Sequence, residues 1–446
     1  MKAWLRRTFK IQPEEKGLVL VLGFILLTSA LAGEISGIVS VSNFLEVSGA
    51  NGILIVWVID MVIMLLMTAM QSLFVDRFSR LTLMRVMTLG FVGAFLILRL
   101  LFVFHAPLTL AYGFLYLLST QQLLIFPIFF WLLANDVFDM AQTKRLFPLI
   151  AATAFMGGLL GIGFSTVQPT LFARAGVPDT ELFTFNVLIY LAIYVILEMG
   201  FRKVKWRETV PKVETVKETL MEGWEFVREV ESFRYLIFAL AALAICDVII
   251  EFRFLSVFET TFVTAEAYQQ YYSLYRLGYV LLAFLFQSFI TGTLIDKLSL
   301  KKVFFIYPAA ALTGLLGMLS LPGIVTGVGA ILLEKISAYA IDEPARKSFQ
   351  ALVPEERRGR VSIFMDSYLY AGGSIVGALL LLLIIGLGTL FAWPYYHYVY
   401  LSVAILAALF AIWAIYKMRQ VYDKSLFNWR IKRRQRRASV LDGLDF

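Results

Sequence analysis

Long apolar runs separated by short polar connections make up most of this chain of 446 residues. A helix rises about 1.5 Å per residue, so each run is long enough to cross roughly 30 Å of hydrocarbon. We predict twelve membrane spans: Gly17 to Leu45, Ile53 to Phe74, Thr82 to Phe104, Leu108 to Ala134, Leu146 to Val167, Phe183 to Phe201, Phe233 to Phe262, Tyr271 to Ile295, Val303 to Leu321, Ile324 to Ile341, Val361 to Leu387, and Tyr395 to Met418. The unbroken runs exclude a membrane β-barrel, whose strands alternate apolar and polar positions.

Composition agrees with a membrane protein. Hydrophobic residues are 60% of the chain and charged residues 16%, with a mean hydropathy of +0.78. The net charge of +8 comes from bases concentrated in short connections and at both ends, so it indicates membrane topology rather than nucleic-acid binding. The first apolar run continues past Gly33, too long for a signal peptide, so we expect it to remain as a span.

The distribution of lysine and arginine predicts the topology. Alternate connections lack both residues: Glu46 to Gly52, His105 to Pro107, Val263 to Gln270, Pro322 to Gly323, and Gly388 to Pro394. Arg174, between the fifth and sixth spans, is the exception. By the positive-inside rule, we expect both termini in the cytoplasm and the chain in the cell inner (cytoplasmic) membrane.

The chain divides into two similar halves with a tether between them. We predict an N-terminal six-helix bundle at 1–201, a cytoplasmic amphipathic connector at 202–232, a C-terminal six-helix bundle at 233–418 and a basic cytoplasmic tail at 419–446. The connector carries an apolar stripe that we expect to face lipid headgroups or the bundle: Val213, Val216, Leu220, Trp224 and Val227. The tail lacks apolar periodicity, so we expect it to be disordered or to lie on anionic lipid.

A short charged motif occurs once in each half, between the second and third spans of that half. The two copies contain these residues: Asp76, Arg77 and Arg80 in the first, and Asp296, Lys297 and Lys301 in the second. A carboxylate at a helix end can pair with bases in one conformation and lose them in another. We therefore predict that both motifs act in gating.

Ionisable residues within the spans are the candidates for function, because each costs about 2.5 to 3.5 kcal/mol at membrane depth. The predicted cavity residues are Glu34, Gln121, Asp247, Glu251, Glu334 and Lys335. Asp247 and Glu251 are one helical turn apart and share a face, so we expect one of them to bind and release a proton or both to share a cation. The alternative is that each acid is neutralised by a base on an adjacent span, such as Glu251 by Lys335 or Asp60 by Arg99.

Glycines cluster in equivalent spans of the two halves. The fifth span contains Gly157, Gly158, Gly161 and Gly163, and the eleventh contains Gly372, Gly373 and Gly377. Small residues let helices approach closely, so we expect these positions at moving surfaces between the halves.

The charged motif resembles that of the major facilitator superfamily, Gly-x-x-x-Asp-Arg/Lys-x-x-Arg/Lys. Gly292, Asp296, Lys297 and Lys301 match it, while Ser72 replaces the glycine of the first copy. The resemblance covers the whole chain. It implies an all-α membrane protein with two pseudo-symmetric six-helix bundles, a site lined mainly by spans one, four, seven and ten, and alternating access.

A narrower likeness covers Phe130 to Asn135 and Lys144 to Leu149, which resemble the ATP/ADP translocase branch of nucleotide transporters. That family reads Phe-Trp-x-x-Ala-Asn followed by Ala-Lys-Arg-Phe-Tyr-Pro. Its first span usually bears a Lys-Asp pair thought to meet phosphate, whereas this first span offers Glu34 and no lysine beyond its entrance.

The leading hypothesis is a secondary active transporter that moves a small polar or charged solute by alternating access, with protons as a possible coupling ion. The alternatives are a nucleotide antiporter of the ATP/ADP type and a non-transporting membrane module that binds a cytoplasmic partner. We expect no enzymatic activity, since the chain has no Gly-x-x-x-x-Gly-Lys-Ser/Thr loop. With Cys246 as the single cysteine and only two histidines, we expect no metal and no cofactor. The expected partners are a small-molecule substrate and membrane lipid, with no nucleic acid, and the chain is expected to be a monomer.

Overall fold

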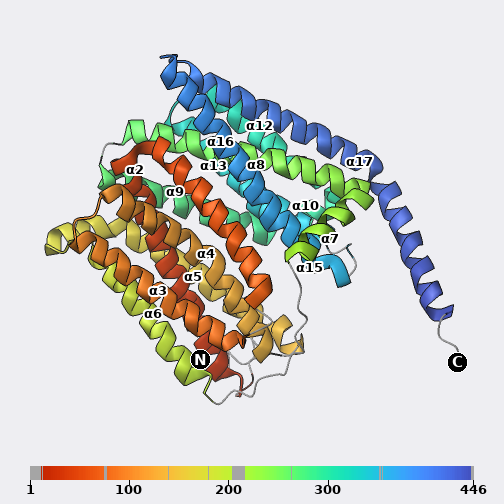
Figure 1. Cartoon of the computed structure of the whole chain (residues 1–446), viewed down its shortest axis with the longest axis horizontal. Coiled ribbons are helices and arrows are strands. Elements are labelled where there is room, and N and C mark those ends of the chain that lie inside the picture. Colours follow the sequence, from red (N-terminus) through yellow and green to blue (C-terminus); the bar gives the residue numbers. More distant parts are fainter. Residues whose placement is uncertain are drawn as a thin grey trace. The chain divides into compact units, whose positions relative to one another are not determined.

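The computed structural model describes residues 12, 14–74, 78–138, 140–178, 180–202, 216–262, 264–350, 353 and 355–442. Every regular element in these ranges is helical (Figure 1). The elements of the first half of the sequence are α2 (Lys16–Phe74), α3 (Arg80–Val103), α4 (Leu108–Val137), α5 (Met140–Ala175), α6 (Glu181–Gly200) and α7 (Val216–Glu229). Those of the second half are α8 (Glu231–Thr261), α9 (Ala265–Leu285), η1 (Phe286–Ile290), α10 (Thr291–Leu298), α11 (Leu300–Val303), α12 (Ile306–Ser320), α13 (Ile324–Lys335), η2 (Ile336–Asp342), α14 (Glu343–Gln350), α15 (Glu355–Ile363), η3 (Phe364–Tyr368), α16 (Leu369–Leu390) and α17 (Tyr396–Asp442).

Eleven helices in the described ranges are long and apolar enough to cross a membrane. The first of them, α2, contains both of the first two predicted spans. Its helical geometry is interrupted at Gly49, whose φ of 66° and ψ of 174° lie outside the helical region. Glycine adopts this left-handed φ without a steric penalty, which is why the chain breaks here. The predicted all-α membrane fold is confirmed.

The described chain forms two compact units. Unit 1 comprises residues 1–60, 66–213 and 259–280, and unit 2 comprises 61–65, 214–258 and 281–446. In unit 1, α3 packs against both α4 and α6. Tyr190 of α6 stacks on Phe91 of α3 with ring centroids 4.9 Å apart, and Gln122 of α4 donates a hydrogen bond of 2.9 Å to the Tyr190 hydroxyl. In unit 2, α12 packs against α13 and α17.

The connector helix α7 packs against α15 and η3 within unit 2. A Cβ at Gly223 would lie 2.7 Å from the Phe364 Cβ, so the two helices meet at a glycine. Phe226 and Val227 are buried, whereas Trp224 is 55% exposed. Val227 therefore faces the bundle, whereas Trp224 points away from it, since the close approach at Gly223 buries a neighbouring face of α7. For Trp224, contact with lipid headgroups stays a prediction. Val213 lies outside the described residues, as do the side chains of Val216 and Leu220.

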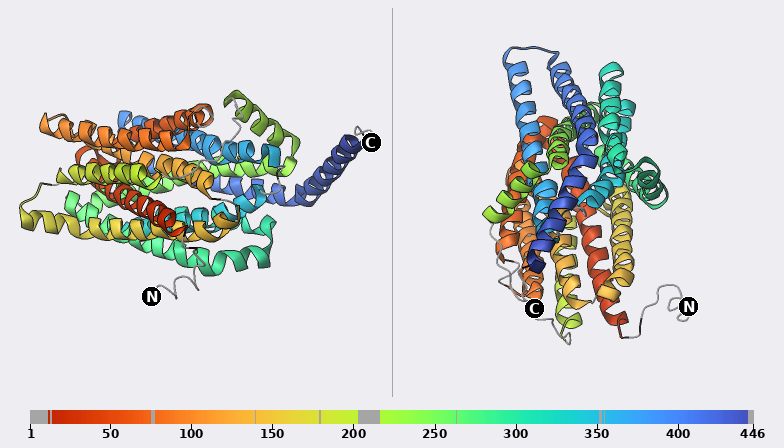
Figure 2. Two further views of the ribbon diagram at one scale, coloured as in Figure 1. Left: turned by 90° about the horizontal axis from the view of Figure 1, so that it is seen from below. Right: turned by 90° about the vertical axis from the view of Figure 1, so that its right-hand side faces the viewer.

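The C-terminal helix α17 continues far beyond the predicted last span. Both views of Figure 2 show the blue helix extending to the C-terminal end of the described chain, and its backbone is helical to Asp442. Of the two alternatives predicted for the tail, disorder is wrong for residues 419–442, and a position on anionic lipid stays a prediction. Their high content of lysine, arginine and glutamine favours helix in spite of the missing apolar period.

Candidate functional site

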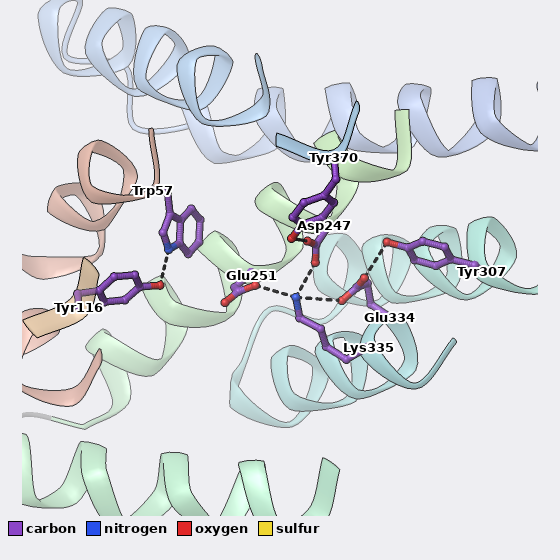
Figure 3. Close-up of polar contacts among 8 residues, drawn as sticks. All are labelled: Trp57, Tyr116, Asp247, Glu251, Tyr307, Glu334, Lys335 and Tyr370. Atoms are coloured by element: carbon purple, nitrogen blue, oxygen red, sulfur yellow. Dashed lines mark hydrogen bonds and ion pairs between the residues drawn. The ribbon is translucent and has the colours of Figure 1, made fainter. Parts of the chain in front are cut away.

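Four of the predicted site residues meet in unit 2. Asp247 and Glu251 lie one turn apart on α8, and Glu334 and Lys335 end α13. The Lys335 Nζ donates hydrogen bonds of 2.6 Å to Asp247 Oδ1 and 2.8 Å to Glu251 Oε2 (Figure 3). It lies 3.7 Å from Glu334 Oε2. One ammonium group thus faces three carboxylates, and the Glu251–Lys335 pairing that was given as the alternative to a proton- or cation-binding role is present.

Two tyrosines complete this cluster from other helices. Tyr307 of α12 donates a hydrogen bond of 2.9 Å to Glu334 Oε1, and Tyr370 of α16 donates one of 3.0 Å to Asp247 Oδ2. Neither tyrosine was among the residues predicted from sequence. The available signal was a phenol inside an apolar run, and it is weak because tyrosines also occur at headgroup level. We call these six residues the acidic cluster: Asp247, Glu251, Tyr307, Glu334, Lys335 and Tyr370.

Burial makes the charge balance of the acidic cluster important. The side chains of Glu334, Asp247 and Lys335 are 1%, 6% and 12% exposed, while Glu251 is 29% exposed. With every group ionised, three carboxylates and one ammonium sum to a charge of −2. An isolated buried ion costs several kcal/mol, so the cluster favours additional positive charge, as protons or a bound cation.

Local helix geometry changes immediately after Lys335. The segment η2 is a π-helix, and it contacts a second π-helical segment, η1. The Thr291 hydroxyl, just after η1, donates a hydrogen bond of 2.6 Å to the Ala340 carbonyl in η2. π-Helical insertions are rare and occur frequently at functional sites.

Glu34 and Gln121, the remaining predicted cavity residues, lie in unit 1. Arg276 Nη2 lies 2.8 Å from each carboxylate oxygen of Glu34. Gln121 Nε2 donates a hydrogen bond of 2.8 Å to Asp60 Oδ1. Both predicted residues are thus engaged with polar partners at membrane depth.

The suggested neutralisation of Asp60 by Arg99 is wrong. Arg99 instead forms two hydrogen bonds of 2.9 Å with Glu181 at the start of α6. A guanidinium fork fits a carboxylate in this two-bond geometry, and Glu181 offers both oxygens. Asp60 receives the amide of Gln121, a neutral donor that leaves its charge uncompensated.

The predicted gating residues are only partly paired. Arg80 lies 3.5 Å from Asp136 in unit 1, and Lys301 Nζ lies 2.7 Å from Asp423 in unit 2. Asp296 and Lys297 are exposed on α10. Asp76 and Arg77 lie outside the described residues. Their gating role stays a prediction.

Among the described residues, no group of three histidine, cysteine, aspartate or glutamate side chains has an arrangement suited to a metal ion. Carboxylates such as those of the acidic cluster can exchange protons and bind a cation through their oxygens, which here surround the Lys335 ammonium group.

Comparison with known proteins gives similarity in structure. No protein-family model matches the chain, and no curated protein matches its sequence. A bacterial homologue of the iron transporter ferroportin, solved in an inward-facing state, is 16% identical with a TM-score of 0.60 over 91% of this chain and all of that chain.

Two other transporters have similar structures. An auto-inhibited peptide transporter of the POT family is 12% identical with a TM-score of 0.62 over 90% of this chain and 96% of that chain. The nucleoside transporter NupG is 13% identical with a TM-score of 0.58 over 91% of this chain and 100% of that chain. The TM-scores show a shared fold. The chain has the all-helical membrane fold of these transporters, as the resemblance to the major facilitator superfamily implies.

Proposed function

We propose that this protein is a secondary active transporter that moves a small polar or charged solute across the cytoplasmic membrane by alternating access. The fold supports this proposal, since proteins as different as iron, peptide and nucleoside transporters share it. We further propose that it acts as a monomer with both termini in the cytoplasm, contacts its substrate and membrane lipid, and has no enzymatic activity.

The acidic cluster is the observation that carries the proposal. Asp247, Glu251 and Glu334 are held at membrane depth around Lys335, although an apolar core would be less costly there. Ionisable residues inside a membrane protein mark solute pathways and proton relays by default. We assign proton coupling to these carboxylates, because a proton taken up by one of them relieves the excess negative charge.

We propose that Glu34, Gln121, Asp247, Glu251, Glu334 and Lys335 line the transport cavity. Supporting this, each of the six lies within a membrane-spanning segment and engages another polar side chain. Ordinary helix packing in lipid does not require so many charges.

The test is gradient-driven uptake by the purified chain in liposomes. With a panel of labelled solutes and an imposed pH gradient, Asp247→Asn and Glu251→Gln should each abolish uptake and leave the size-exclusion profile unchanged. Glu266→Gln, an exposed acid in the first turn of α9, is the matched control and should keep full uptake. Unchanged uptake in both cluster variants would contradict the assigned role.

A nucleotide antiporter is the second candidate, supported by the likeness of Phe130 to Asn135 and Lys144 to Leu149 to the ATP/ADP translocases. This candidate predicts counterflow of labelled ATP against ADP and its loss in Lys335→Ala. The charge of the acidic cluster favours the first proposal, since phosphate recognition needs several convergent cations and this cluster contains one.

A third candidate is a membrane module that binds a cytoplasmic partner and transports nothing. Its supporting observation is the long basic helix at the end of α17. It predicts that deleting residues 425–446 removes the phenotype of the gene while liposome uptake is absent for every solute.

A further inference from the structure

The charge and exposure of the acidic cluster indicate which class of solute it accepts. We infer that the transported solute is a cation that binds through an ammonium or guanidinium group at Glu251. This inference rests on the transport function proposed above and adds the substrate class.

Lys335 shows what the acidic cluster binds. Its ammonium group sits within hydrogen-bond distance of Asp247 and Glu251, at 2.6 and 2.8 Å. An ammonium has three donors and no acceptor, so the carboxylate oxygens around it form a site made for donors that carry positive charge. The side chain of the protein therefore occupies the position that a charged amine from solution would take.

Glu251 is the carboxylate that an incoming solute reaches. Its side chain is 29% exposed, whereas those of Asp247 and Glu334 are 6% and 1% exposed. The two buried acids each accept a hydrogen bond from a tyrosine hydroxyl. The Glu251 carboxylate instead accepts a hydrogen bond from the Lys335 ammonium.

Glu334 provides a second place for the Lys335 ammonium. Its Oε1 accepts the Tyr307 hydroxyl, but its buried Oε2 has no hydrogen-bond partner within the described part of the chain. That oxygen is 3.7 Å from Lys335 Nζ, just beyond hydrogen-bond distance. When a solute cation takes Glu251, Lys335 can close this gap, keep its bond to Asp247 and satisfy the orphaned oxygen. Solute binding then replaces the Lys335–Glu251 ion pair with a Lys335–Glu334 ion pair, and no buried carboxylate is left without a cation.

Other solute classes fit this arrangement less well. An anion is repelled by a cluster whose formal charge is −2 with every group ionised. A neutral solute leaves that charge as it was and offers no replacement for Lys335 at Glu251. A cation is the class that both lowers the net charge and makes the exchange possible.

Three probes of equal length test the inference: butylammonium, butyramide and butyrate, which carry charges of +1, 0 and −1. Butylammonium also has the length of a lysine side chain. Their binding to the full chain in detergent is measured by thermal shift and by calorimetric titration. Butylammonium should bind and raise the melting temperature, whereas the other two should not.

Variants locate the binding. Glu251→Gln should weaken butylammonium binding by about tenfold or more, since it removes a charged partner from the exposed end of the acidic cluster. Lys335→Ala should strengthen it, because the probe then fills the vacated position without competition. Glu266→Gln should bind as the unchanged protein does. If Lys335→Ala fails to fold, Glu251→Gln decides the test, because Glu251 is partly exposed and its substitution disturbs the fold less.

The outcomes separate this inference from the proposed function. Equal binding of the three probes, or Glu251-dependent uptake of a neutral or anionic solute, overturns the cation assignment and leaves transport standing. Binding of butylammonium at Glu251 with no liposome uptake of any solute supports the cation site and overturns transport.

Discussion

Single residues decide whether the buried charges of this protein are tolerated. Lys335 is the extreme case, because its ammonium serves Asp247 and Glu251 directly and approaches Glu334. Breaking a buried ion pair from one side is far more costly than replacing the whole pair with neutral groups. The difference in cost predicts that removing Lys335 alone lowers the stability of the protein more than removing Lys335 together with its acidic partners.

Lys335→Met should destabilise the protein by about 3–5 kcal/mol, since it leaves three acids without their cation. Adding Asp247→Asn and Glu251→Gln to Lys335→Met should recover much of that loss. Thermal unfolding in detergent micelles measures both changes. A triple variant no more stable than Lys335→Met would show that the charges are not what couples these residues.

A second ion pair lies in unit 1, between Glu15, just before the first span, and Arg145. Glu15 accepts hydrogen bonds of 2.6 and 3.0 Å from Arg145 and one of 3.1 Å from Gln142. The Arg145 guanidinium holds the pKa of the Glu15 carboxyl below its ordinary value. The carboxylate thus joins the chain just before α2 to the beginning of α5.

Because the pKa of Glu15 is lower in the folded state, its ionised carboxylate stabilises the protein at pH values above the unfolded pKa of about 4.3. That stabilisation is lost as the pH falls through the folded-state pKa. Arg145→Gln should therefore lower stability at pH 7 by about 1–3 kcal/mol and have a smaller effect below pH 4. Unfolding curves at several pH values provide the measurement. An equal loss at pH 7 and pH 3 would mean that Arg145 acts through packing alone.

At the scale of elements, glycines bring the same pair of helices together in each half. A Cβ at Gly161 of α5 would lie 2.7 Å from the Leu31 carbonyl oxygen of α2, and one at Gly157 would collide with the Leu27 carbonyl. In unit 2, a Cβ at Gly373 of α16 would lie 2.7 Å from the Ala244 Cβ of α8. These contacts join the first and fifth spans of each half. The contacts of Gly157, Gly161 and Gly373 lie inside a unit, so these three glycines pack helices within a half rather than at a surface between halves. Gly163 and Gly372, from the same predicted set, have no such contact.

Gly157→Ala should lower stability by about 1–3 kcal/mol, because its methyl group meets the backbone of α2. Gly163→Ala, six residues further along the same helix, is the matched control, since no atom of another described helix lies within 4 Å of its Cβ position. That change should have an effect within about 0.5 kcal/mol. Both are compared by thermal unfolding of the purified chain, and similar losses in the two variants would rule out the contact with α2 as the cause.

At the scale of the whole molecule, the distribution of lysine and arginine is the main determinant of orientation. Apart from Arg174, connections rich in lysine and arginine alternate along the sequence with connections that lack both residues. We therefore predict that both chain ends lie on the basic side of the membrane.

Green fluorescent protein fused after Phe446 should therefore fluoresce, and alkaline phosphatase fused there should be inactive. Alkaline phosphatase fused after Gln270, in a predicted outer connection, should be active and serves as the control. The reverse pattern of activities would overturn the proposed orientation.

The helices were largely predictable because membrane spans are read from local composition. Helix ends and breaks were less so. The connection predicted at Glu46 to Gly52 proved to be helical apart from Gly49, and α17 extends well past Met418. Backbone hydrogen bonds can extend a helix beyond its apolar segment into polar residues. The apolar content of a segment therefore does not predict where its helix ends.

The candidate site was predictable in its residues and not in its pairings. Asp247, Glu251, Glu334 and Lys335 stood out as charges in an apolar background, and the structure brings these four side chains together. Their place in a transport cavity stays a prediction. Tyr307 and Tyr370 were missed, and Arg99 proved to pair with Glu181 rather than Asp60.

The sequence by itself determined that this chain is a bundle of membrane helices with costly charges inside it, because hydrocarbon imposes the same requirement on every span. Which helices bring those charges together was decided by tertiary structure. Glu34 and Arg276 are 242 positions apart and form one ion pair, a contact that depends on how helices pack and not on the composition of either span. Local sequence composition determines where a membrane helix forms, because each span must satisfy the same hydrocarbon environment. The packing of the helices determines which distant residues form ion pairs.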